Sequence, residues 1–279
     1  MEIQRLRENR QMADILEIKN VSKTYDAGGD NPVKALDGVD LSIAEGEFVS
    51  IIGPSGCGKS TLFNIIGGLI DDHDGEVLID GHEVDGAHKD VGVVFQEEST
   101  FPWRSTLDNV AFPLEIEGID KAEREETARK FIKLVGLEGF ENHFPAQLSG
   151  GMKQRTAVAR TLAYEPRIML MDEPFGALDE QTRMLLGDKM LEIWAALNQT
   201  MLLITHNITE AVQLSDRVVV MSYRPGIIKE IIPIELPRPR TSEVIATAEF
   251  GTYVGKLWTL LREEASRGMH DTEKSLFFT

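Results

Sequence analysis

A glycine-rich segment at positions 53–61 carries residue types suited to binding a phosphate chain. It has the sequence GPSGCGKST, follows the apolar run FVSII and leads into a predicted helix from Lys59 to about Ile70. In a strand–loop–helix context, the pattern G-x-x-x-x-G-K-S holds phosphates with backbone N–H groups, because glycines permit turns that a side chain would block. We expect the phosphate-binding residues to be Gly53, Pro54, Ser55, Gly56, Cys57, Gly58, Lys59, Ser60 and Thr61.

Three side chains of this loop have specific chemistry. Lys59 can reach the β- and γ-phosphates of a nucleotide, and the Ser60 hydroxyl can bind Mg²⁺, which prefers oxygen ligands. Cys57 could be a thiol of lowered pKa, because it lies at a helix N-terminus. The sequence places no histidine or second cysteine to activate it, so we interpret Cys57 as a small residue that the loop tolerates.

A pair of acidic residues follows a second apolar run. RIMLMDEP contains Asp172 and Glu173, and consecutive strand residues point to opposite sides of a sheet. Asp172 can therefore orient Mg²⁺ and its waters, while Glu173 faces an attacking water as general base or water-positioning group, a role worth roughly 10²–10⁴ in rate. Alone, the pair could be a helix N-cap with an acidic first turn. Together with the phosphate loop, it favours a catalytic site.

A second Ser-Gly-Gly turn occurs in LSGGMKQR, positions 148–155, with no strand in front of it. Gly150 and Gly151 open a predicted helix, so free N–H groups and the positive end of the helix dipole would face an anion. A simple N-cap at Ser149 would explain the serine but would not need two glycines. Helix capping alone therefore does not account for this turn.

The elements around these residues follow an α/β pattern. Residues 15–21 alternate like an edge strand, and the apolar residues 48–52 are a candidate central strand. From position 167 onward strands and helices alternate, which indicates βαβ units and a parallel sheet. A largely helical stretch interrupts this pattern, with charge pairing such as Glu125 to Arg129. The proline-punctuated residues 224–240 are expected to be extended.

The composition limits the classes of function. The chain has 279 residues, enough for one large two-lobed domain or two small ones, and a net charge of −17, which argues against a free-standing nucleic-acid or anionic-membrane binder. Its one cysteine permits no intrachain disulfide and fits a reducing compartment. The N-terminus has no apolar signal segment, and no apolar run approaches the length of a membrane span. If the protein acts at a membrane, we expect another subunit to hold it there.

Taken together, the motifs resemble those of the ATP-binding subunit of an ABC transporter, over about residues 15–225. GPSGCGKST resembles the Walker A loop, LSGGMKQR the signature, IMLMDEP the Walker B strand and GALD the D-loop, in the family's order. Tyr25, Gln96 and His206 match the adenine-stacking aromatic residue, the Q-loop and the switch histidine. Met152 departs from the pattern, since many members have glutamine there.

The resemblance implies a P-loop NTPase (RecA-like) α/β core with a mainly parallel sheet, an antiparallel β subdomain and an inserted α-helical lobe. It also implies three regions: an N-terminal extension over 1–14, an ABC ATPase domain over 15–240 with the helical lobe at about 97–165, and a C-terminal extension over 241–279. The implied cofactors are ATP and Mg²⁺. The implied catalytic residues are Glu173, His206 and Gln96, and the implied metal ligands are Ser60, Gln96 and Asp172.

Two such chains are expected to pair head to tail, as a homodimer or with another ATPase subunit. Ser149, Gly150 and Gly151 of one chain would then cap the γ-phosphate held by the Walker A loop of the other, and Asp179 of the D-loop would lie at the dimer interface. In a two-fold interface each patch meets its counterpart reciprocally. This arrangement explains a second phosphate-binding turn in a chain that already has one.

Residues 95–118 and 224–240 resemble the importer branch for nitrate, sulfonate and taurine. The resemblance implies an ATP-hydrolysing motor at the cytoplasmic face of the membrane, held there by permease subunits and working with an extracytoplasmic solute-binding protein, with no nucleic-acid partner. Phe101, Pro102 and Trp103 would either pack in the helical lobe or receive a permease helix. The alternatives are a soluble ABC-type ATPase, which would be expected to carry a second nucleotide domain or a coiled coil, and a P-loop kinase, which would not explain LSGG or GALD.

Overall fold

The computed structural model describes residues 14–277 except for 30, 98 and 177. The expected N-terminal extension lies outside these residues, apart from Asp14, which begins β1. The strands are β1 (Asp14–Tyr25), β2 (Val33–Ala44), β3 (Phe48–Ile52), β4 (Asp74–Ile79), β5 (His82–Glu83), β6 (Val91–Val94), β7 (Ile168–Asp172), β8 (Thr200–Ile204), β9 (Arg217–Met221) and β10 (Ile228–Pro233). The α-helices are α2 (Lys59–Ile66), α3 (Thr106–Ile116), α4 (Lys121–Leu134), α5 (Gly150–Ala163), α6 (Glu180–Leu197), α7 (Ile208–Leu214) and α8 (Ala248–Phe277).

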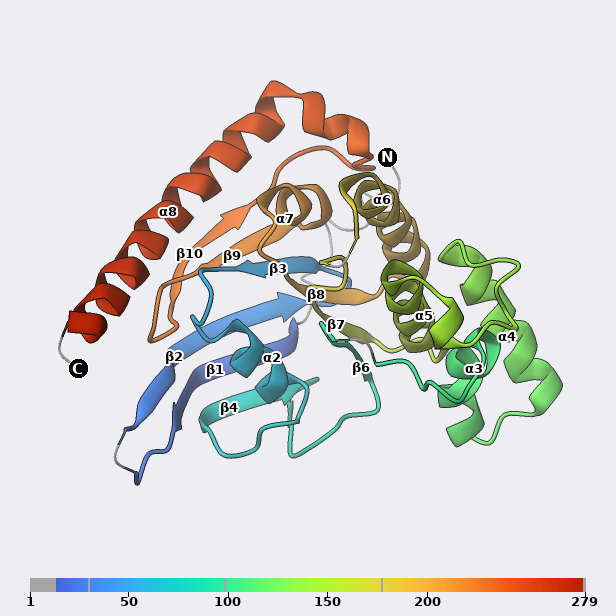
Figure 1. Ribbon diagram of the computed structural model, residues 1–279. Helices are drawn as coiled ribbons and strands as arrows, with labels where there is room; N and C mark the ends of the chain where they lie inside the picture. The colour runs from blue at the N-terminus through green and yellow to red at the C-terminus, as the bar shows by residue number, and fades with distance from the viewer. Residues whose placement is uncertain (1–13, 30, 98, 177, 278–279) are drawn as a thin grey trace.

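The strands form two sheets (Figure 1). One has the order β2-β1-β4-β5 and is antiparallel. The other has the order β10-β9-β3-β8-β7-β6, and all of its neighbours are parallel except β10 and β9. Every residue of β3, β7 and β8 is buried, because layers of structure cover both faces of the parallel part. The expected mainly parallel sheet and antiparallel subdomain are confirmed.

The helix after the phosphate loop is shorter than the sequence suggests. It was expected to reach about Ile70, but α2 ends at Ile66. The reason is a close approach of two turns: Gly68 has a φ of +67°, and a Cβ at this position would lie 1.9 Å from the carbonyl oxygen of Gly86. No other residue fits there, so the chain leaves the helix at this point.

The helices α3, α4 and α5 pack on one another and form the helical lobe (Figure 1). Side chains of Ser105, Asp120 and Ser149 cap their first turns, as free N–H groups at a helix start require. The expected pair on α4 is present, with 3.8 Å between Glu125 Oε2 and Arg129 Nη2. The helices of the lobe are therefore stabilised by N-caps and an i,i+4 ion pair, which can be recognised in the sequence.

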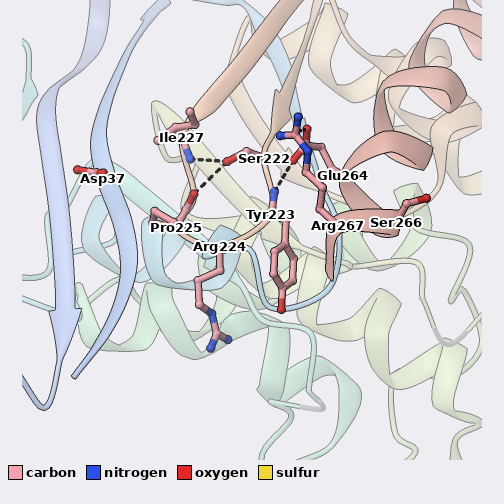
Figure 2. Close-up of a pocket in the computed structure, with 9 residues that line it drawn as sticks. All are labelled: Asp37, Ser222, Tyr223, Arg224, Pro225, Ile227, Glu264, Ser266 and Arg267. Atoms are coloured by element: carbon pink, nitrogen blue, oxygen red, sulfur yellow. Dashed lines mark hydrogen bonds and ion pairs between the residues drawn. The ribbon is translucent and has the colours of Figure 1, made fainter. Parts of the chain in front are cut away.

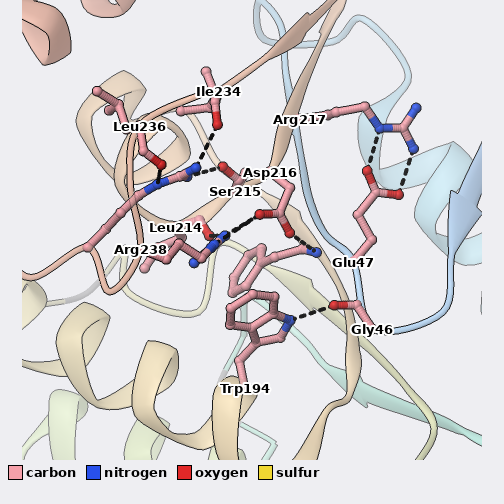
Figure 3. A network of polar contacts seen from close by, with 12 residues as sticks. Gly46, Glu47, Trp194, Leu214, Ser215, Asp216, Arg217, Ile234, Leu236 and Arg238 are labelled. Atoms are coloured by element: carbon pink, nitrogen blue, oxygen red, sulfur yellow. Dashed lines mark hydrogen bonds and ion pairs between the residues drawn. The ribbon is translucent and has the colours of Figure 1, made fainter. Parts of the chain in front are cut away.

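The residues after β9 are tied to the parallel sheet by two arginines (Figure 3). Arg238 donates to Asp216, and its guanidinium lies 4.0 Å from the centre of the Trp194 ring. Arg240 is 3% exposed and donates to the carbonyls of Ser215, Ile234 and Leu236. Burial lowers the pKa of Arg240 to about 10. The segment expected to be extended is therefore fixed by side-chain bonds, and β10 within it is a strand of the sheet.

The long helix α8 covers the β10 edge of this sheet (Figure 1). Its residues Phe250 and Leu257 are buried against α7, β9 and β10. In the part of the chain that the structure describes, no helix has both the length and the apolar character needed to cross a bilayer.

A buried carboxyl fixes the connection from β8 to α7. Glu210 is 7% exposed, and one of its oxygens accepts a hydrogen bond from the Thr205 hydroxyl, which also accepts from Asn207 N at 3.0 Å. The other oxygen is buried and has no hydrogen-bond partner among the described residues. Burial raises the pKa of Glu210 from 4.5 to about 7.

From the raised pKa of Glu210 we expect the stability of the folded protein to depend on pH. The pKa of Glu210 is higher in the folded state than in the unfolded state. The contribution of this carboxyl to the free energy of unfolding is therefore fully present below about pH 4.5 and is lost as the pH rises to about 7. Glu210→Gln removes the charge and keeps a polar group beside Thr205. We expect the variant to be more stable than the wild type at pH 8, by up to ~3 kcal/mol, and to converge with it toward pH 5.

Urea unfolding of both proteins, followed by circular dichroism from pH 5 to 8.5, measures this difference. Glu126→Gln, on the exposed face of α4, is the matched control and should leave the profile unchanged. Parallel profiles for wild type and Glu210→Gln would show that the carboxyl is charged at neutral pH.

Candidate active site

The phosphate loop joins β3 to α2, and its backbone is set by glycines. Gly58 has a φ of +98°, and a Cβ there would lie 2.7 Å from the carbonyl oxygen of Ala35. Gly58 is also the N-cap of α2 and provides no side-chain cap. The first N–H groups of α2 are therefore available to an anion, as a phosphate site at a helix N-terminus requires.

The Lys59 side chain turns back into this loop. It is 9% exposed, and its ammonium donates to the carbonyls of Gly53 at 2.8 Å and Pro54 at 3.0 Å. Cys57 is fully buried beside it, and burial raises the pKa of the thiol. A raised pKa is the opposite of what a reactive thiol needs, which supports the packing interpretation of Cys57.

The two acidic residues at the end of β7 face different groups. Asp172 is 8% exposed, and burial raises the pKa of its carboxyl, while Ser60 and Lys59 act in the opposite direction. The Ser60 hydroxyl and the Asp172 carboxyl thus lie together, and hard oxygen donors of this kind suit Mg²⁺. Glu173 instead has a φ of +46°, a left-handed conformation that is rare for a residue with a side chain.

One oxygen of Glu173 is the meeting point of three segments. Gln96 Nε2 donates to Glu173 Oε2 at 3.1 Å, and His206 Nδ1 lies 3.1 Å from the same oxygen. Gln96 follows β6, Glu173 follows β7 and His206 follows β8, and these strands are neighbours in the sheet. The carboxyl ends of parallel strands meet at one edge, so residues far apart in sequence converge there. The three expected catalytic side chains are therefore in contact.

Tyr25, at the end of β1, lies beside the phosphate loop. Its hydroxyl is 3.3 Å from Thr61 Oγ1, and 42% of the residue is exposed. A cavity of about 220 Å³ is lined by Tyr25, Val33, Ala35, Gly56, Gly58, Lys59, Ser60, Thr61 and Arg224. Arg224 was not among the expected site residues, because the sequence predicts an extended conformation and a likeness to one importer branch for the segment 224–240, but no role in nucleotide binding.

The Ser-Gly-Gly turn and the D-loop contact each other. Ser149 is the N-cap of α5 and accepts from Met152 N at 3.3 Å, so the N-cap interpretation holds as far as it goes. A Cβ at Gly151 would lie 2.4 Å from Leu178, which gives this glycine a packing role that the sequence did not reveal. Asp179 caps α6 through Thr182 N and Oγ1, at 3.0 and 2.7 Å.

The structure does not bring the Ser-Gly-Gly turn to its own phosphate loop. Among the described residues, Ser149 and Gly150 form no hydrogen bond or ion pair with residues 53–61, and both are exposed. In Figure 1 α5 lies with the helical lobe, whereas α2 lies by the antiparallel sheet. Within one chain, then, the two candidate phosphate-binding turns belong to different surfaces.

Comparison with known proteins agrees with this geometry. The sequence profile described as ABC transporter matches residues 36–176. An uncharacterized ABC transporter ATP-binding protein of Methanocaldococcus jannaschii is 52% identical, with 91% of this chain and 94% of the relative covered. The nitrate import ATP-binding protein of Synechocystis sp. is 42% identical (88% and 95% covered), and an aliphatic sulfonates import ATP-binding protein of Bacillus cereus is 43% identical (80% and 88% covered).

The structural comparison points the same way. A solved dimeric ATP-binding cassette in a post-hydrolysis state, bound to ADP and Pi, superposes with a TM-score of 0.72 at 36% identity, covering 80% of this chain and all of that one. With a family profile over half of its length and relatives aligned over most of it, this chain belongs to the ABC transporter family, as one of its ATP-binding, ATP-hydrolysing subunits.

Proposed function

We propose that this chain is the motor subunit of an importer for a small anion such as nitrate, a sulfonate or taurine, and that it hydrolyses ATP in a head-to-tail pair of chains. The observation that carries the proposed catalytic roles is the Glu173 oxygen that lies 3.1 Å from both Gln96 and His206. The importer role is supported by relatives named for the import of nitrate and aliphatic sulfonates.

The proposed reaction starts at the phosphate loop. The bonds from Lys59 to the carbonyls of Gly53 and Pro54 are exchanged for charge-assisted bonds to the β- and γ-phosphates when ATP binds. Glu173 accepts a proton from the water whose oxygen attacks the γ-phosphorus. The bond from that phosphorus to the bridging oxygen breaks, and ADP and inorganic phosphate are released. Gln96 and His206 hold the carboxylate in position.

Mg²⁺ fits the oxygen donors beside this loop. The Ser60 hydroxyl and the Asp172 carboxyl are adjacent, and Gln96 adds an amide oxygen from the next strand end. Bound there, the ion supplies positive charge to the phosphate oxygens. The burial of Asp172 limits the water that would otherwise compete for this carboxylate.

The dimeric part of the proposal rests on the Ser-Gly-Gly turn. Ser149 and Gly150 are exposed and form no hydrogen bond or ion pair with residues 53–61 of their own chain. A related cassette was solved as a dimer with ADP and Pi. We infer that the start of α5, with its unpaired N–H groups, faces the γ-phosphate on a second chain, and that Asp179 lies beside the same interface.

The proposed contact with the membrane permease is the loop around Trp103. This residue is 72% exposed and lies against Phe101, with 5.7 Å between ring centres. The Asn109 amide donates to the carbonyls of Phe101, Arg104 and Ser105, which holds the loop on α3. A rigidly presented, exposed tryptophan is a suitable anchor for a partner helix. The permease, with its extracytoplasmic binding protein, would hold this chain at the cytoplasmic face of the membrane.

The general-base role predicts the effect of Glu173→Gln. Glutamine keeps the size of the side chain and removes the proton acceptor, so ATP hydrolysis should fall by ~10²–10⁴-fold while ATP affinity is retained. A stable dimer should accumulate with ATP and Mg²⁺. Phosphate release, equilibrium binding and size-exclusion chromatography measure the three properties. Near-wild-type turnover would rule out the role, and Glu126→Gln on α4 serves as the control.

The trans arrangement predicts complementation between two inactive variants, Lys59→Ala and Gly150→Asp. The second places a carboxylate where the γ-phosphate should lie. In a mixed dimer one composite site carries both lesions and the other carries neither, so ATPase activity should recover to at most about half of the wild-type value per dimer. If the turn acted within its own chain, every site would keep a lesion and mixing would restore nothing.

Heterodimer formation must be verified, for example with two affinity tags on the two variants. Counting bound ATP per heterodimer distinguishes a failed trans site from two sites that must act together. One bound ATP per heterodimer together with recovered ATPase activity supports the trans arrangement. One bound ATP at the intact site without ATPase activity shows that the two sites must act together.

The docking proposal predicts that Trp103→Ala affects assembly rather than chemistry. ATPase activity of the isolated subunit should stay within about twofold of the wild type, while co-purification with the permease and transport in cells should decrease. Trp258→Ala on α8 is the matched control, because Trp258 is also exposed, at 62%. A large decrease in melting temperature for Trp103→Ala alone would instead show that this residue packs in the lobe.

A further inference from the structure

Arg224 is a cation at the edge of the candidate nucleotide site. It lines the 220 Å³ cavity together with Tyr25 and Thr61. Its Nε and Nη2 both lie 3.4 Å from the carbonyl oxygen of Gly56, a long and weak contact. The side chain is exposed and forms no ion pair with any described carboxylate. Its guanidinium is therefore not committed to an anionic partner within this part of the chain.

The connection that carries Arg224 is packed directly on the phosphate loop. Gly226 N donates to Ala35 O at 2.9 Å, and Gly226 O accepts from Asp37 N at 3.1 Å. A Cβ at Gly226 would lie 2.1 Å from the carbonyl oxygen of Cys57. Ser222 closes the turn, donating to Pro225 O at 3.0 Å and accepting from Ile227 N at 3.1 Å (Figure 2). The backbone around Arg224 is thus fixed relative to the loop.

The helix α8 supports the same turn from the other side. Glu264, 1% exposed, accepts from Tyr223 N at 3.0 Å (Figure 2). It also pairs with Lys229 at 2.9 Å. A Cβ at Gly268 would lie 2.7 Å from the Tyr223 ring, so helix and turn are in close contact. A second cavity of about 650 Å³ adjoins the turn and α8, and Arg224 lines both cavities. The C-terminal helix therefore fixes the residue next to Arg224.

We propose that Arg224 is a further nucleotide-binding residue, which contacts a phosphate oxygen near the adenosine end of the bound nucleotide, and that α8 positions it through Glu264. A guanidinium matches phosphate oxygens in geometry and charge. Arg224 lines the same cavity as Tyr25, the expected adenine-stacking residue, and lies 3.4 Å from the carbonyl oxygen of Gly56 in the phosphate loop. The inference rests on the proposed function, because it takes residues 53–61 as the site of the phosphates.

Calorimetric binding of ATP and ADP to full-length protein tests the first part. We expect Arg224→Ala to weaken both nucleotides to a similar extent, ~10-fold, because a contact near the adenosine end does not depend on the γ-phosphate. The nucleotide affinity of Arg224→Lys should lie between that of the wild type and that of Arg224→Ala. Arg129→Ala, an exposed arginine on α4, is the matched control and should bind like the wild type. Wild-type affinity of Arg224→Ala for both nucleotides would overturn the proposal, and weakening of ATP alone would move the contact to the γ-phosphate.

Lys59→Ala separates this inference from the proposed function. If Lys59→Ala weakens ATP binding and Arg224→Ala does not, only the role of Arg224 is wrong. If neither variant weakens binding, the phosphate site itself is misassigned.

The positioning role of α8 is tested by a double-mutant cycle. Glu264→Gln should weaken ATP binding ~3-fold in the wild-type background and leave it unchanged in the Arg224→Ala background, because the helix acts through the arginine. An equal loss in both backgrounds would show a merely structural effect of Glu264 and would overturn the positioning role. Melting temperatures of the variants show whether each one is folded.

Discussion

The carboxyl ends of β3, β8, β7 and β6 lie next to one another, and this shared edge is the constraint on which the candidate site depends. Parallel neighbours end on the same side, so the residues after each strand are brought together whatever their separation in sequence. The phosphate loop leaves β3, His206 follows β8, Glu173 follows β7 and Gln96 follows β6. The buried strands β3, β7 and β8 fix the relative positions of these residues, and the layers that cover the sheet exclude water from the strands.

Two residues of the candidate site, Asp172 and Glu173, adopt arrangements that are unfavourable in most proteins. Glu173 holds a positive φ, which costs of the order of 1–3 kcal/mol and persists only where surrounding contacts enforce it. Here its N–H donates to Ile204 O at 2.9 Å, and its carboxyl contacts Gln96 and His206. Asp172 is buried despite its charge. Both features are common where a site is built before its ligand arrives.

The residues after β9 connect the phosphate loop to the C-terminal helix. The turn 222–227 lies against the phosphate loop, and α8 holds that turn through Glu264. Two arginines, Arg238 and Arg240, anchor the intervening segment to the sheet. The phosphate loop, the turn 222–227 and the C-terminal helix thus form one continuous set of contacts.

The sequence by itself determined the local elements and the residue types of the site. The glycine loop, the buried strand before Asp172 and Glu173 and the capped helices all have short-range signals, because backbone turns, strand burial and N-caps depend on adjacent residues. Only the tertiary structure decided what distant segments do to one another. It ended α2 at Ile66, where Gly68 approaches Gly86, and placed Leu178 against Gly151. It also brought Gln96 and His206 to one oxygen of Glu173 and set Arg224 beside Gly56. Contacts of this kind join residues tens to more than a hundred positions apart, and no periodicity or motif spacing encodes them.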